Sequence, residues 1–207
     1  MAIPAEELSG ALEATRRMRA LVDRTGDLTA PSLLPGWSRA HVVGHLVGNA
    51  RSHIRMLRAS HDEAVVDQYP DGPEGRQREI QELAADPGQA VTELHRSADE
   101  LADVWRSTSD WTGLARPLDG QPIPVARLAW ARWREVEVHA VDLAGDYRPE
   151  AWPAPFLARL LEELRGRPDL PPLDGITGPD PALAAWLSGR SRGEGLHGDL
   201  PELPAWR

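Results

Sequence analysis

The stretch PVARLAWARWREVEVHAVDL, residues 124–143, decides how the rest of the chain is organised. It predicts one helix with Pro124 in the first turn, where the missing N–H of proline costs no hydrogen bond. Glu135 and His139 stand four residues apart, so their side chains lie on one face of this helix, about one turn apart. Asp142 can share that face. A carboxylate and an imidazole placed in this way suit a divalent metal such as zinc, and an ion pair on the helix surface is the alternative interpretation.

Composition excludes several kinds of chemistry. The chain has 207 residues, enough for one substantial domain with a small C-terminal appendage. It contains no Cys, which excludes disulfides, thiolate metal sites and a cysteine nucleophile. All 23 basic residues are Arg, so Schiff-base and P-loop lysine chemistry are excluded as well. Any thiol that takes part in the chemistry must therefore come from another molecule.

Charge and hydropathy indicate where the protein works. The formal net charge is −9 and no basic stripe is visible, which argues against a nucleic-acid partner. The sequence has no apolar run long enough to cross a bilayer and no charged-then-apolar leader, which argues against a membrane partner. We therefore expect a cytoplasmic protein.

Apolar side chains recur at helical spacing along most of the chain. This pattern predicts long helices over residues 5–23, 38–60, 89–107 and 124–143, with a shorter one over 76–84. Ser38 is the expected N-cap of the second helix. A small hairpin between residues 111 and 123 is expected to turn at Asp119–Gly120. Four long helices with one longer crossover predict a mainly α fold, a four-helix bundle over residues 1–148.

Residues 149–207 differ from the rest, because they are rich in Pro and Gly. We expect a helix over residues 152–165 and a brief one over 182–188, separated by irregular segments. This short C-terminal α(+β) extension is too short to bury a core of its own and is expected to pack against the bundle.

Facing side chains on separate helices of a bundle can converge on a metal. Glu135 and His139 with one imidazole from the second helix would give three protein ligands and leave an open position, as catalytic zinc sites require. The spacing alone leaves His41 and His45 as candidates, each of which could instead be an ordinary, partly buried histidine. Three arginines could bind a carboxylate substrate bidentately, or simply be surface charges. They are Arg76, Arg190 and Arg192.

Two motifs, LLPGWSRAHVVGHLVGNA at residues 33–50 and REVEVHAVDL at residues 134–143, resemble the mycothiol-dependent maleylpyruvate isomerase family. That family belongs to the DinB-like group of metal-binding four-helix bundles. The resemblance covers residues 5–150, and SGRSRGEG and LPELPAW near the end resemble the family's C-terminal signature. It implies that His45, rather than His41, binds zinc together with Glu135 and His139.

The resemblance assigns further roles. It implies that Asn49, in the first motif, contacts the thiol cofactor, and that Arg190, in Gly189-Arg190, is the arginine linked to activity. Arg76 resembles a second arginine near the site, in a looser correspondence. The family usually carries a longer C-terminal α/β domain, and residues 168–181 replace most of it here.

The activity implied by the resemblance is cis–trans isomerisation of maleylpyruvate to fumarylpyruvate. Mycothiol, a cysteine-bearing pseudodisaccharide, would bind with its sulfur near the metal, which deprotonates a thiol. Thiolate adds to the cis double bond, the new single bond rotates, and elimination returns the trans isomer. Arg190 or Arg76 would hold a substrate carboxylate.

Two other functions stay open. One is a mycothiol S-transferase that conjugates electrophiles, and the other is a non-catalytic metal-binding bundle. Zinc is the expected metal, but two imidazoles and a carboxylate also accept nickel, iron or manganese. The expected partners are mycothiol and a small-molecule substrate, and the chain is expected to be a monomer or a homodimer.

Overall fold

The computed structural model describes residues 3–118 and 120–206, and the chain divides into two compact units, Met1–Ala144 and Gly145–Arg207. The elements of the first unit are α1 (Ala5–Arg24), α2 (Arg39–His61), α3 (Gly72–Ala85), α4 (Pro87–Ser107), β1 (Leu114–Ala115), β2 (Ile123–Pro124) and α5 (Arg127–Asp142). Those of the second are the 3₁₀ helix η1 (Pro149–Ala151), α6 (Ala154–Arg165) and α7 (Asp180–Leu187). Among the described residues, no helix combines the length and apolar character needed to span a membrane.

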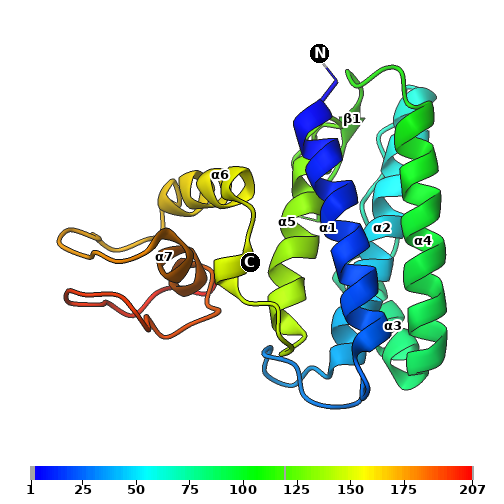
Figure 1. The fold of residues 1–207 in the computed structure, drawn as a ribbon. Helices are drawn as coiled ribbons and strands as arrows, with labels where there is room; N and C mark the ends of the chain where they lie inside the picture. The colour runs from blue at the N-terminus through cyan, green and yellow to red at the C-terminus, as the bar shows by residue number, and fades with distance from the viewer. Residues whose placement is uncertain (1–2, 119, 207) are drawn as a thin grey trace. The chain divides into compact units, whose positions relative to one another are not determined.

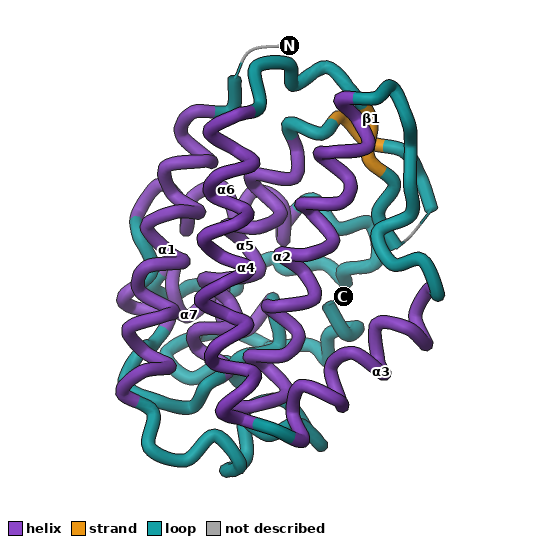
Figure 2. The backbone as a smooth tube through the Cα atoms, turned by 90° about the vertical axis from the view of Figure 1, so that its right-hand side faces the viewer, coloured by secondary structure: helices purple, strands orange, loops and turns teal. Residues whose placement is uncertain are grey.

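The first unit is a four-helix bundle made of α1, α2, α4 and α5 (Figures 1 and 2). Contacts run around the bundle from α1 to α5, from α5 to α2, from α2 to α4 and back to α1. In Figure 1, α1 and α5 run in one direction and α2 and α4 in the other. Because α2 and α4 are parallel, their connection must return along the bundle, and it carries α3, which packs on both. The predicted mainly α fold is confirmed.

Helix α2 begins with a reciprocal cap. The hydroxyl oxygen of Ser38 accepts a hydrogen bond from the backbone N–H of His41, and the backbone N–H of Ser38 donates to His41 Nδ1 at 3.2 Å. This capping box satisfies donors that the first turn would otherwise leave unpaired. The predicted N-cap is thus confirmed, and it fixes the start of the helix that carries His45.

The start of α5 differs from the prediction. Pro124 lies in β2, opposite Leu114 of β1, and the helix begins three residues later, at Arg127. Proline is tolerated in an edge strand because its missing N–H need not pair there. The predicted hairpin is present as the antiparallel β1–β2 pair, while Asp119 of its expected turn lies outside the described residues.

Close packing of α1 against α5 depends on Gly10. A Cβ atom built at this position would overlap the indole ring of Trp133, which is buried in α5. We predict that Gly10→Ala lowers the free energy of unfolding, because overpacking costs about 1–3 kcal/mol and the better helix propensity of alanine returns at most about 1 kcal/mol. Urea denaturation measures this difference.

The matched control is Gly88→Ala in the first turn of α4. There the nearest atom to the added Cβ is Asp86 Oδ1, at an ordinary contact distance of 3.5 Å. This variant should be neutral or slightly more stable than the parent. Equal stabilities of the two variants would show that the α1–α5 spacing adapts without cost.

The second unit is compact by itself, which the sequence did not predict. Helix α6 packs against α7, and α7 against η1. Thr177 and His197 exchange backbone hydrogen bonds of 2.9 and 2.8 Å in an isolated antiparallel bridge. The unit is therefore helical, with one β bridge joining its irregular segments.

Candidate metal centre

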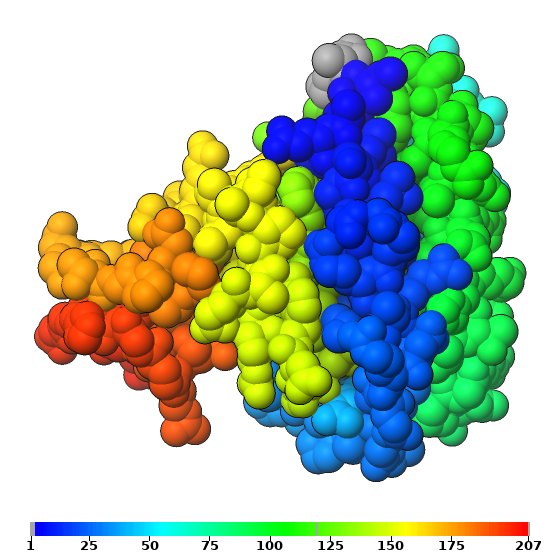
Figure 3. Space-filling view, viewed as in Figure 1, coloured from blue at the N-terminus to red at the C-terminus, as the bar shows by residue number. Residues whose placement is uncertain are grey.

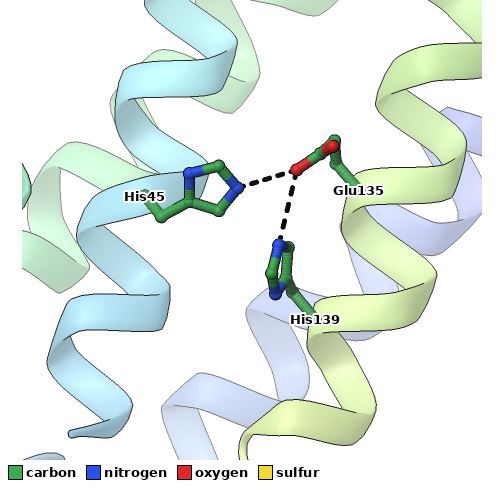
Figure 4. Close-up of side chains that lie close together, drawn as sticks. All are labelled: His45, Glu135 and His139. Carbon is green, nitrogen blue, oxygen red and sulfur yellow. Dashed lines mark hydrogen bonds and ion pairs between the residues drawn. The ribbon is translucent and has the colours of Figure 1, made fainter. Parts of the chain in front are cut away.

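Three potential metal ligands converge from two helices. His45 comes from α2, and Glu135 and His139 come from α5, with one ligand atom of each lying within 4.8 Å of the others. Both rings point at the same carboxylate oxygen (Figure 4): Glu135 Oε2 lies 2.7 Å from His45 Nε2 and 3.4 Å from His139 Nε2. The structure thus brings together the three residues predicted as ligands.

The donor set fits zinc. Two imidazole nitrogens and one carboxylate oxygen are common zinc ligands, and three protein ligands leave a coordination position for another molecule. The His45 side chain is only 6% exposed, whereas that of Glu135 is 23% exposed and that of His139 12%. Within this group, the His45 side chain is therefore shielded from solvent, and those of Glu135 and His139 are more accessible.

Asp142, which the sequence places on the same helix face, forms a hydrogen bond with His139. Asp142 is fully buried, and its Oδ2 lies 2.8 Å from His139 Nδ1. A carboxylate that accepts the Nδ1–H bond holds the ring so that Nε2 faces the ligand group. The backbone carbonyl of Asp142 also accepts a hydrogen bond from Leu33 N at 2.9 Å, which ties the loop before α2 to the end of α5.

Arg76 lies on the other side of His45. From α3, its Nη2 donates to His45 Nδ1 at 3.1 Å. A nitrogen that accepts a hydrogen bond carries no proton, so the neutral His45 ring has its proton on Nε2 and donates to Glu135. The sequence placed Arg76 near the site only through a loose correspondence, and the structure shows direct contact with one of the three potential ligands.

The electrostatic environment sets the charges of the group. Burial lowers the pKa of His45 to about 4, and the hydrogen bond that His45 donates to Glu135 offsets only part of this effect, so the ring is neutral at pH 7. Burial also disfavours the charged form of His139, but hydrogen bonds with Asp142 and Glu135 outweigh it and raise its pKa. Likewise, burial would raise the pKa of Glu135, but hydrogen bonds from His139 and His45 hold it well below its usual range.

The raised pKa of His139 predicts that protons compete with metal. A group with a raised pKa stays protonated up to a higher pH, and a metal must displace that proton to bind. We expect zinc affinity to fall about tenfold for each pH unit below the pKa of His139 and to level off above it. Titration calorimetry in two buffers of different ionisation enthalpy measures the affinity and the released proton together.

Asp142→Asn is the matched variant for this experiment. It removes the carboxylate that raises the pKa of His139, so the fall in affinity should move to lower pH. A zinc affinity that does not change between pH 5 and 7 in the parent protein would contradict the prediction.

Asn49, the expected cofactor contact, is buried one turn beyond His45. Its Oδ1 accepts a hydrogen bond of 2.8 Å from Arg132 Nη1, which also donates to the Leu46 carbonyl at 2.8 Å. The side chain of Asn49 thus joins α2 to α5 next to the metal group, and its contact with a cofactor stays a prediction. Sequence reasoning missed Arg132, although it stands three residues before Glu135 and shares its helix face.

Arg190 belongs to the second unit. Its Nη1 donates to the Ser188 carbonyl at 2.6 Å, and its guanidinium carbon lies 5.5 Å from the centre of the Trp206 ring. These contacts lie within that unit, and a role of Arg190 in substrate binding stays a prediction.

Comparisons with known proteins identify a family and a fold. A family model described as "Mycothiol maleylpyruvate isomerase N-terminal domain" matches residues 11–144. Among solved structures, the fold is similar to a mycothiol-dependent maleylpyruvate isomerase, with a TM-score of 0.90 and 24% sequence identity over 99% of this chain and 98% of that chain. A histidine-to-alanine mutant of such an isomerase gives a TM-score of 0.88 at the same identity and coverage. No curated protein matches the chain.

At 24% identity, the likeness to these structures shows a shared fold. It extends through the C-terminal unit, so relative to these structures the chain is not shortened.

Proposed function

The chain belongs to the mycothiol maleylpyruvate isomerase family, whose N-terminal-domain model matches most of its length, and on this premise we propose that it isomerises maleylpyruvate to fumarylpyruvate with mycothiol and zinc. The observation that carries the proposal is the convergence of His45, Glu135 and His139 from two helices on one point. A ligand group that leaves a position open, in a chain without Cys, suits a reaction whose thiol comes from a cofactor.

The chain's own residues would hold and orient this group. When bound there, a divalent cation favours the thiolate form of a nearby thiol at neutral pH. The neutral ring of His45 needs no deprotonation to act as a ligand, because burial keeps its pKa at about 4. Asp142 holds the ring of His139 in the tautomer that leaves Nε2 available to a metal.

Charged side chains would bind the substrate. Maleylpyruvate carries carboxylates, and a guanidinium binds a carboxylate with two parallel hydrogen bonds. Arg76 donates a hydrogen bond to His45, one of the three potential ligands, so we assign it to a substrate carboxylate near the reacting double bond. Arg190 is proposed as a second arginine for the substrate, and Asn49 as a contact of the cofactor.

The test is an isomerisation assay of the zinc-loaded protein with and without mycothiol. We expect conversion of maleylpyruvate only when both zinc and mycothiol are present. An S-conjugation assay with a general electrophile runs beside it, because the same ligand group would activate a thiol for transfer. Conjugation without isomerisation would identify a mycothiol S-transferase, and the absence of both would identify a non-catalytic metal-binding bundle.

A further inference from the structure

Trp37 differs from the other tryptophans of the first unit. Six of the eight indoles are buried, at positions 105, 111, 130, 133, 152 and 186. Within the first unit, Trp37 alone keeps a partly exposed ring among the tryptophans, all of which are described. The first unit thus uses its other indoles as core side chains and leaves that of Trp37 partly open to solvent.

The backbone around Trp37 is fixed at several points. Its N–H donates to the Leu34 carbonyl at 3.0 Å, and its own carbonyl accepts from Ser32 N at 2.9 Å. The turn between them contains Gly36 with a φ of +79°, a conformation that glycine adopts without strain. The loop joins α1 to α2 at the lower end of the bundle in Figures 1 and 3. The partly exposed ring therefore belongs to a loop whose backbone is fixed by hydrogen bonds.

The ring lies beside the metal group. Its centre is 5.9 Å from that of His45 and 6.1 Å from that of His41, whose Nδ1 is engaged by Ser38. Within the described part of the chain, the indole N–H of Trp37 has no hydrogen-bond acceptor. An aromatic face and a donor are thus available next to a potential ligand of the metal.

We propose that Trp37 forms a carbohydrate subsite that binds the sugar portion of the thiol cofactor. This proposal rests on the proposed function, since it takes the thiol to be mycothiol. In mycothiol only a short cysteinyl arm separates the sulfur from the amide-linked sugar, so a sulfur near the ligand group keeps the sugar close to it. The ring centre of Trp37 lies 5.9 Å from that of His45, one of the potential ligands. The C–H face of a sugar packs on an indole ring, and a sugar hydroxyl accepts from its N–H.

The subsite predicts an effect that depends on the sugar. Trp37→Ala should raise the KM for mycothiol about tenfold, which is the usual scale for one aromatic contact. With cysteine as a sugar-free thiol, the rate should stay within about twofold of the parent. Trp37→Phe keeps an aromatic face without the N–H and should give an intermediate KM for mycothiol. Leu33→Ala, which removes an exposed apolar side chain from the same loop, is the matched control and should change neither thiol's kinetics.

A binding experiment tests the subsite without catalysis. The pseudodisaccharide that lacks its cysteine should bind the zinc-loaded parent protein in titration calorimetry, and Trp37→Ala should abolish this binding while zinc content stays the same. Equal losses with mycothiol and cysteine would overturn the proposal, because they would mean that Trp37 only supports His45. An unchanged KM for mycothiol would also overturn it. If neither the parent nor any variant isomerises maleylpyruvate, the proposed function fails, but the calorimetric comparison of sugar binding by the parent and Trp37→Ala still tests the subsite.

Discussion

Replacing His45 with alanine is expected to reduce bound zinc to background and to lower mycothiol-dependent isomerisation by more than about a hundredfold. Even loss of an outer partner of a metal ligand typically costs about 10–100-fold, and this change removes a ligand outright. It also removes the ligand that α2 contributes, leaving Glu135 and His139 on α5. Elemental analysis measures the zinc, and circular dichroism checks that the chain still folds.

His41→Ala is the matched control. It removes the same type of side chain from the same helix, one turn earlier, where the ring serves the cap of α2. This variant should lose about 1 kcal/mol of stability through the cap and keep its zinc. Full zinc content in His45→Ala would remove His45 from the site, and loss of zinc in His41→Ala would show that the cap positions the ligands.

Arg76→Met should lower kcat/KM for maleylpyruvate by about tenfold to a hundredfold while zinc content stays unchanged. The change removes charge-assisted hydrogen bonds to a substrate carboxylate, and such bonds contribute about 1.5–3 kcal/mol each. Methionine keeps much of the length and apolar stem of arginine, so packing on α3 is disturbed little. Steady-state kinetics at saturating mycothiol measures the effect.

Arg78→Met on the same helix is the control for Arg76. Arg78 is exposed and pairs with Asp71, so its loss should leave the kinetics unchanged. A drop in zinc content for Arg76→Met would mean that the arginine acts by holding His45. Unchanged kinetics in that variant would exclude Arg76 from substrate binding.

Helical periodicity was sufficient to predict the bundle, because apolar side chains recur at helical spacing along each long helix, although only α1 and α4 bury a single face. Spacing could not choose between His41 and His45, since residues four apart share a face. The distinction depends on Ser38, three residues before His41, which engages that ring in the cap. Pro124 was assigned to the wrong element because proline fits the first turn of a helix and an edge strand equally well.

Sequence patterns also could not reveal which charges are buried. Among the described residues, Arg132, Glu137 and Asp142 are the buried charged side chains. Glu137 pairs with Arg17 and Asp142 with His139, whereas Arg132 bonds only to a backbone carbonyl and an amide oxygen. A polar residue on an amphipathic helix is ordinarily expected at the surface. Only the packing of α5 against α2 determines that this guanidinium is enclosed.

The contact between Arg76 and His45 has a thermodynamic consequence. A neutral imidazole that binds metal through Nε2 keeps its proton on Nδ1, and this nitrogen can then no longer accept a hydrogen bond from Arg76. Loading the site therefore releases the guanidinium for an anionic ligand. Because such linkage is reciprocal, a bound carboxylate ligand should raise the affinity for the metal by the same factor by which the metal raises the affinity for the carboxylate. The two ligands would bind with positive cooperativity, and the metal-free protein would have a lower affinity for substrate than the loaded one.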